Sequence, residues 1–180
     1  MTAPVLSFEQ SPPLTVPLRF FLTGPLFAVL AAVVIAWDGP DAFASRWTPS
    51  LLAATHLITL GFLTMVSSGA LLQLLPVVVG TGVPAPRLTV AGVHLFLSTG
   101  TLSLAAGLGA NAPALLLMAV PLLAAALGAL LAAMGYALWR APSRNAVVTT
   151  LRLAAVALLA TVLLGLTLAV ALARGWALPY

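Results

Sequence analysis

The chain has 180 residues, of which 62% are hydrophobic and only 6% charged, and its mean hydropathy is +1.18. This composition leaves too little polar surface for a water-soluble globule and predicts an integral membrane protein. The net charge of +4 comes from arginines scattered singly between apolar segments, a pattern typical of membrane topology and not of nucleic-acid binding.

The first 37 residues contain a tail and a membrane span. Residues 1–17 hold four prolines, and proline cannot extend a helix because it lacks an N–H, so an irregular N-terminal tail is predicted. Residues 18–37 are apolar and long enough to cross a hydrocarbon core, which takes about 20 residues; a kink is expected at Gly24-Pro25. This run exceeds the usual 7–15 apolar residues of a signal peptide, so we expect a retained helix.

Four further spans follow. Thr48-Pro49-Ser50 is a favourable helix opening, because threonine can cap free N–H groups and proline is preorganised in the first turn. The predicted spans cover residues 49–75, 88–108, 113–139 and 146–173. No stretch alternates with period two as the strands of a membrane barrel do. The predicted fold is an all-α, polytopic transmembrane bundle of about five helices, forming a single domain over residues 18–180.

The arginines predict the orientation of the bundle. Five fall on the side of the amino terminus and two fall opposite, together with Asp38 and Asp41; the five are Arg19, Arg87, Arg140, Arg144 and Arg152, and the two are Arg46 and Arg174. Because positive residues favour the cytoplasmic side, the amino terminus is predicted to be cytoplasmic and the carboxy terminus to be outside.

The second span carries the most informative residue, His56. An ionisable or metal-binding side chain at membrane depth is costly unless it is paired or ligated. His56 lies about seven residues into the span, or roughly 10 Å deep at about 1.5 Å per residue. Helical steps from it predict an apolar face that could accept a flat macrocycle, made of Leu60, Leu63, Ser67, Ala70 and Leu74. The alternative is a neutral histidine bonded to a backbone carbonyl or a nearby threonine.

The third span carries His94 at the opposite side of the membrane. The predicted axial separation of the two histidines is on the order of 10 Å or more, too far for both to ligate one haem iron within one chain. His94 is a weaker metal-ligand candidate, and its alternative is a packing histidine bonded to Ser98 or to another helix. The second span also offers Gln73, expected to donate an interhelical hydrogen bond, and a set of small residues expected first to allow close helix packing, namely Gly61, Ser67, Ser68 and Gly69.

Several functions are excluded or disfavoured. Without cysteine there are no thiolate metal sites, iron–sulfur clusters or covalent c-type haem. The predicted spans contain no carboxylate, which disfavours a proton pump or an ion-coupled transporter, and no hydrolytic cluster. Copper is not expected, since Met65, Met118 and Met134 occur singly on different helices. The chain is not expected to be an enzyme by itself.

Residues 56–76 resemble the second transmembrane helix of the haem–copper oxidase subunit I superfamily, which includes nitric oxide reductases. The resemblance rests on His56, on the glycines Gly61 and Gly69 that follow it, and on the helix number and depth. It implies that His56 is an axial ligand of a b-type haem, with Gly61, Ser67 and Ala70 beside the ring. It also implies the inner (cytoplasmic) membrane of a bacterium.

The departures from that superfamily limit the implied function. Subunit I has more helices and draws its other haem and copper ligands from histidines that this chain lacks, so the chain cannot assemble an oxygen-reducing centre alone and reads like the amino-terminal part of a longer subunit. The missing ligand could come from the His56 of a second copy, at equal depth, or from a partner redox subunit. The expected function is electron transfer, haem handling or gas sensing. The alternatives are a structural or assembly subunit of a membrane redox complex and a small-substrate transporter.

Overall fold

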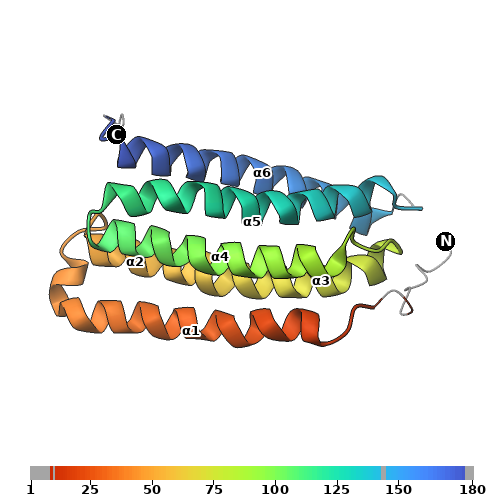
Figure 1. The fold of residues 1–180 in the computed structure, drawn as a ribbon, viewed down its shortest axis with the longest axis horizontal. Helices are drawn as coiled ribbons and strands as arrows, with labels where there is room; N and C mark the ends of the chain where they lie inside the picture. The colour runs from red at the N-terminus through yellow and green to blue at the C-terminus, as the bar shows by residue number, and fades with distance from the viewer. Residues whose placement is uncertain (1–8, 10, 143–144, 177–180) are drawn as a thin grey trace.

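Helices account for the long segments of the computed structural model, which describes residues 9, 11–142 and 145–176. Five helical spans lie side by side along one long axis, and the chain passes back and forth between the two ends of the bundle (Figure 1). Each is long and apolar enough to cross a membrane, which implies a lipid bilayer as its surroundings. The prediction of an all-α bundle with five membrane spans is confirmed.

The spans have the following bounds. The first is α1 (Thr15–Asp38), continued by a short 3₁₀ turn, η2 (Gly39–Phe43). The second is divided into α2 (Pro49–His56), a π-helical stretch η3 (Leu57–Thr64) and α3 (Met65–Val79). The other three are single helices, namely α4 (Pro86–Gly109), α5 (Pro113–Trp139) and α6 (Ala146–Ala173).

Two boundaries differ from the predicted ones by three residues or more. Helix α1 begins at Thr15, before Pro17, because the first N–H groups of a helix have no intrahelical partner and proline costs little there. It continues through Pro25 as one helix. The second span passes Pro76 and ends at Gly80, whose positive φ of 72° closes the helix as glycine readily does. Residues 1–8 and 10 of the predicted tail, and Arg144, lie outside the described residues.

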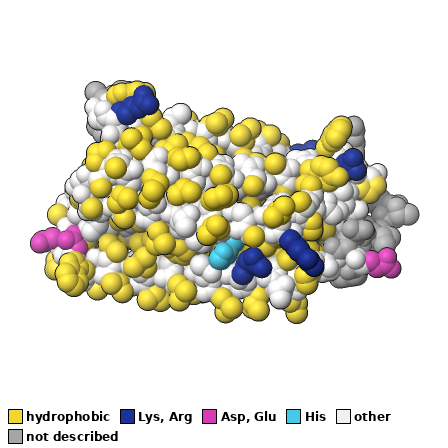
Figure 2. Space-filling model, in the orientation of Figure 1, with side chains coloured by type: hydrophobic (Ala, Val, Ile, Leu, Met, Phe, Trp, Pro, Cys, Tyr) yellow, Lys and Arg dark blue, Asp and Glu magenta, His cyan; other side chains and the backbone are white. Residues whose placement is uncertain are grey.

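The contacts between helices show how the bundle is assembled. The second span packs against α1 on one side and α4 on another, α4 packs along α5, and α6 packs mainly against α5. Helix α6 therefore forms an edge of the bundle and exposes most of its leucines. Hydrophobic side chains are spread along the whole visible face of the bundle, as a lipid-facing surface requires (Figure 2).

Candidate functional site

A π-helical stretch begins immediately after His56. In a π-helix each backbone bond spans five residues instead of four, so the side chains fall on different faces than they would in an α-helix. The threonines record this change: the Thr59 hydroxyl donates to the Thr55 carbonyl, four residues back, at 2.9 Å, whereas the Thr64 hydroxyl donates to the Thr59 carbonyl, five residues back, at 2.8 Å. Such stretches are rare and occur frequently at functional sites.

The apolar face predicted from His56 and the cavity that His56 lines coincide only in part. That prediction assumed α-helical steps through Leu63 and on to Leu74, but these two side chains are 53% and 56% exposed and face outward. The side chains of the second span that line a cavity together with His56 are instead Leu52, Thr59, Leu60 and Thr64. Beyond Leu60, the predicted face therefore does not line this cavity, because the π-helical stretch shifts the register of the side chains that follow it.

The imidazole of His56 is held by its own helix. Its Nδ1 lies 2.8 Å from the Leu52 carbonyl oxygen. A carbonyl can only accept, so Nδ1 carries the proton and donates it, which leaves Nε2 as the nitrogen available to a ligand. Metal-bound histidines are usually oriented by such a bond from the other ring nitrogen. The same bond also satisfies a packing histidine, so both interpretations of His56 agree with it.

His56 lines a cavity of about 670 Å³ between the second span, α4, α5 and α6. Cavities of roughly 300–1,000 Å³ with mostly apolar walls and a few polar groups are typical of small-molecule and cofactor sites. The polar side chains of this lining are those of Trp47, His56, Thr59, Thr64 and Thr161. Each of the three threonines donates its hydroxyl hydrogen to a carbonyl of its own helix.

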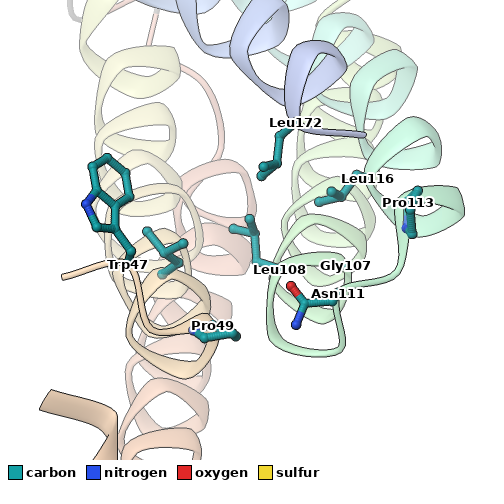
Figure 3. A pocket seen from close by; sticks show the side chains of 9 residues that line it. Trp47, Pro49, Gly107, Leu108, Asn111, Pro113, Leu116 and Leu172 are labelled. Carbon is teal, nitrogen blue, oxygen red and sulfur yellow. The ribbon is translucent and has the colours of Figure 1, made fainter. Parts of the chain in front are cut away.

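A smaller cavity of about 340 Å³ adjoins the first and shares five lining residues with it, namely Trp47, Leu52, Leu108, Leu116 and Leu172. Figure 3 shows this vestibule at the end of the bundle, below α6 and beside the turn that joins α4 to α5. Asn111 of that turn adds a polar group, and the Arg46 guanidinium lies over the Trp47 ring, 5.4 Å from its centre. The cavity of His56 thus lies near the end of the bundle where Arg46 is located.

The other three predicted cofactor-binding residues do not line this cavity. A Cβ on Gly61 would lie 2.4 Å from the Phe27 ring of α1, so this glycine serves a close helix contact. Ser67 is exposed and Ala70 is half-buried. Of the four predicted residues, the structure brings only His56 to the cavity.

His94 joins α4 to α1. The Thr23 hydroxyl donates its hydrogen to the Arg19 carbonyl at 2.8 Å, so it accepts from His94 Nε2 at 2.9 Å. The Phe20 ring meets the imidazole edge to face, with centres 5.2 Å apart. This is the expected packing histidine bonded to another helix, while the Ser98 hydroxyl donates to the His94 carbonyl instead. Within the described residues, no group of three histidine or acidic side chains could hold a metal ion.

One sequence prediction named the wrong kind of partner, and one wall of the cavity was not predicted. The Gln73 amide donates to Ser11 Oγ at 3.1 Å and to the Pro12 carbonyl at 3.0 Å, so it holds the segment before α1 and not a neighbouring helix. The cavity wall on α6, with Thr161 and Gly165, was not predicted at all. The one sequence feature that could have indicated this wall is the spacing of Thr161 and Gly165. They are four positions apart, which places both on one face of an otherwise apolar helix.

The fold and the site together define a multi-pass, all-helical membrane protein with a histidine-lined apolar cavity in its membrane-spanning part. No family model matches the chain, and searches of curated proteins and of solved structures found no match. The resemblance of residues 56–76 to subunit I therefore stays a prediction.

Proposed function

We propose that this protein binds b-type haem in the inner membrane of a bacterium, with Nε2 of His56 as an axial ligand. The observation that carries the proposal is the His56 imidazole, which is fixed through Nδ1 on the Leu52 carbonyl and lines an apolar cavity of about 670 Å³. A histidine ligand and apolar burial are the means by which proteins tune haem for electron transfer or for gas binding.

The chemistry of the surrounding residues supports this proposal. A b-type haem has an apolar ring and carboxylate groups at one edge, so it needs apolar walls and cations near water. The walls come from leucines of α4, α5 and α6. The cation at the vestibule is Arg46, whose guanidinium stacks on the Trp47 ring. Asp38, an acidic residue at the same end of the bundle, accepts a hydrogen bond from Ser50. The proposal uses His56 alone among the four cofactor-binding residues predicted from the sequence.

A structural or assembly subunit of a membrane redox complex is the second candidate. It is favoured by the hydrogen bonds of both histidines, since His56 bonds to Leu52 and His94 bonds to Thr23 within the chain. In that case, His56 would need no ligand.

The two candidates are separated by an optical spectrum of the purified protein. Wild type in mild detergent, supplemented with haem, is expected to show a Soret band. His56→Ala should lose the band, and external imidazole should restore it in part. The matched control is His94→Gln, which keeps a donor for Thr23 and should retain the band. A wild-type protein without the band, or an undiminished band in a well-folded His56→Ala, would contradict haem binding through His56.

A further inference from the structure

The cavity of His56 contains one side chain that can ligate haem iron. Haem proteins use histidine, cysteine, methionine or tyrosine as axial ligands. The described lining of this cavity holds His56 but none of the other three types, and no second histidine. A haem held by His56 would therefore receive only one ligand from these walls.

Helix α6 provides a wall of this cavity from the same chain. Its contribution includes Leu158, Thr161, Val162 and Gly165. The elements α2 and α6 belong to different sides of the bundle, because α2 packs against α1 and α4 whereas α6 packs mainly against α5. Because α6 forms this wall, the described walls of the cavity come from one chain and hold no histidine besides His56.

We propose that a haem ligated by His56 keeps its second axial position open toward the α6 wall, and that this position binds a small neutral gas. The inference rests on the proposed haem binding. Apolar walls disfavour charged ligands, because an ion would lose its hydration there. The space beside α6 is free, since a Cβ on Gly165 would meet no atom within 4 Å.

The threonine hydroxyls of the cavity offer bound oxygen little stabilisation. Bound oxygen carries partial negative charge and is stabilised by hydrogen-bond donors in the distal pocket. Thr161 donates its hydrogen to the Ala157 carbonyl at 2.9 Å, and Thr59 and Thr64 likewise donate to backbone carbonyls. The hydrogens of these three hydroxyls are engaged, so none of them donates to bound oxygen without giving up its bond to a carbonyl. The other donor type in the lining is the indole N–H of Trp47.

The test adds the missing ligand to the α6 wall. Wild-type protein loaded with haem should be high-spin in the ferric form by electron paramagnetic resonance, and its ferrous spectrum should shift on addition of carbon monoxide. Gly165→His should convert the haem to a low-spin, six-coordinate form and weaken carbon monoxide binding about tenfold or more, since the gas must displace the new imidazole. Leu164→His is the matched control: Leu164 is 71% exposed on the lipid side, so this variant should behave as wild type.

The outcomes distinguish a failure of the open axial position from a failure of haem binding through His56. A low-spin wild type that does not bind carbon monoxide, with haem still lost in His56→Ala, would overturn the open position and leave haem binding intact. Absence of haem from the wild type would overturn both. A folded, haem-loaded Gly165→His that stays high-spin would show that α6 does not face the iron. Thr161→His, on the same wall, replaces Gly165→His if that variant does not fold.

Discussion

Single glycines determine how closely α1 approaches the second span. A Cβ on Gly61 would lie 2.4 Å from the Phe27 ring, and one on Gly69 would lie 2.6 Å from Phe20 Cβ. In a membrane, lipid is as apolar as the helices, so close packing at small residues supplies much of the association energy. These two contacts confirm the close-packing role predicted for Gly61 and Gly69.

We therefore expect Gly61→Ala to destabilise the bundle by about 1–3 kcal/mol, the usual cost of overfilling a packed contact. Gly128→Ala is the control, because a Cβ there would meet no atom within 4 Å. It should leave stability unchanged or raise it by about 0.5–1 kcal/mol through helix propensity. Thermal unfolding in detergent, followed by circular dichroism, measures both variants. Equal effects of the two substitutions would contradict the contact with Phe27.

At the scale of helices, sequence reasoning found the spans but not the local form of the second one. Length and hydropathy are enough to locate five spans, because a membrane-crossing helix needs about 20 apolar residues whatever its neighbours are. His56 was recognised because it is polar within such a span. The π-helical stretch was missed because Leu57–Thr64 is as apolar as an α-helical span. The α6 wall was missed because it depends on which helices pack together.

The π-helical stretch predicts different outcomes for two single-residue deletions. A π-helical stretch equals an α-helix with residues added, so deleting exposed Leu63 should restore α-helical geometry while α3 keeps its contacts with α1. Deleting Leu74, equally exposed but within regular α3, should rotate the following residues by about 100° and unpack Leu75 and Val79.

Thermal unfolding midpoints compare these deletions. The Leu63 deletion should unfold near the wild-type temperature or above it and should lose haem, because Thr59 and Thr64 no longer line the cavity in the same register. The Leu74 deletion should unfold well below wild type. Equal destabilisation by the two deletions would contradict this prediction. It would show that the fold itself requires the π-helical stretch.

At the scale of the whole molecule, the helices are longer than the hydrocarbon core of a membrane is thick. The span helices α4, α5 and α6 have 24, 27 and 28 residues, or roughly 36–42 Å at about 1.5 Å per residue, which exceeds a hydrocarbon core of roughly 30 Å. Their ends therefore reach the headgroup regions. There, Trp37 and Trp139 are 91% and 82% exposed, as interfacial aromatic residues should be.

The two ends of the bundle predict which side of the membrane the site faces. Helix α1 begins at the end that carries Arg87 and Arg140, and the vestibule lies at the other end, beside Arg46 (Figures 1 and 3). The excess of arginine at the first end predicts that it is cytoplasmic, so the vestibule should open to the outside.

The absence of native cysteine makes this orientation directly measurable. In intact cells, a membrane-impermeant thiol reagent should label Ala44→Cys, which lies between the first and second spans, and should leave Gly82→Cys unlabelled until the cells are permeabilised. Both positions are exposed, and wild type supplies a background without thiols. The reverse pattern would place the vestibule in the cytoplasm. A haem bound at His56 would then exchange gas with the cytoplasm, and the arginine excess would be determined by something other than topology.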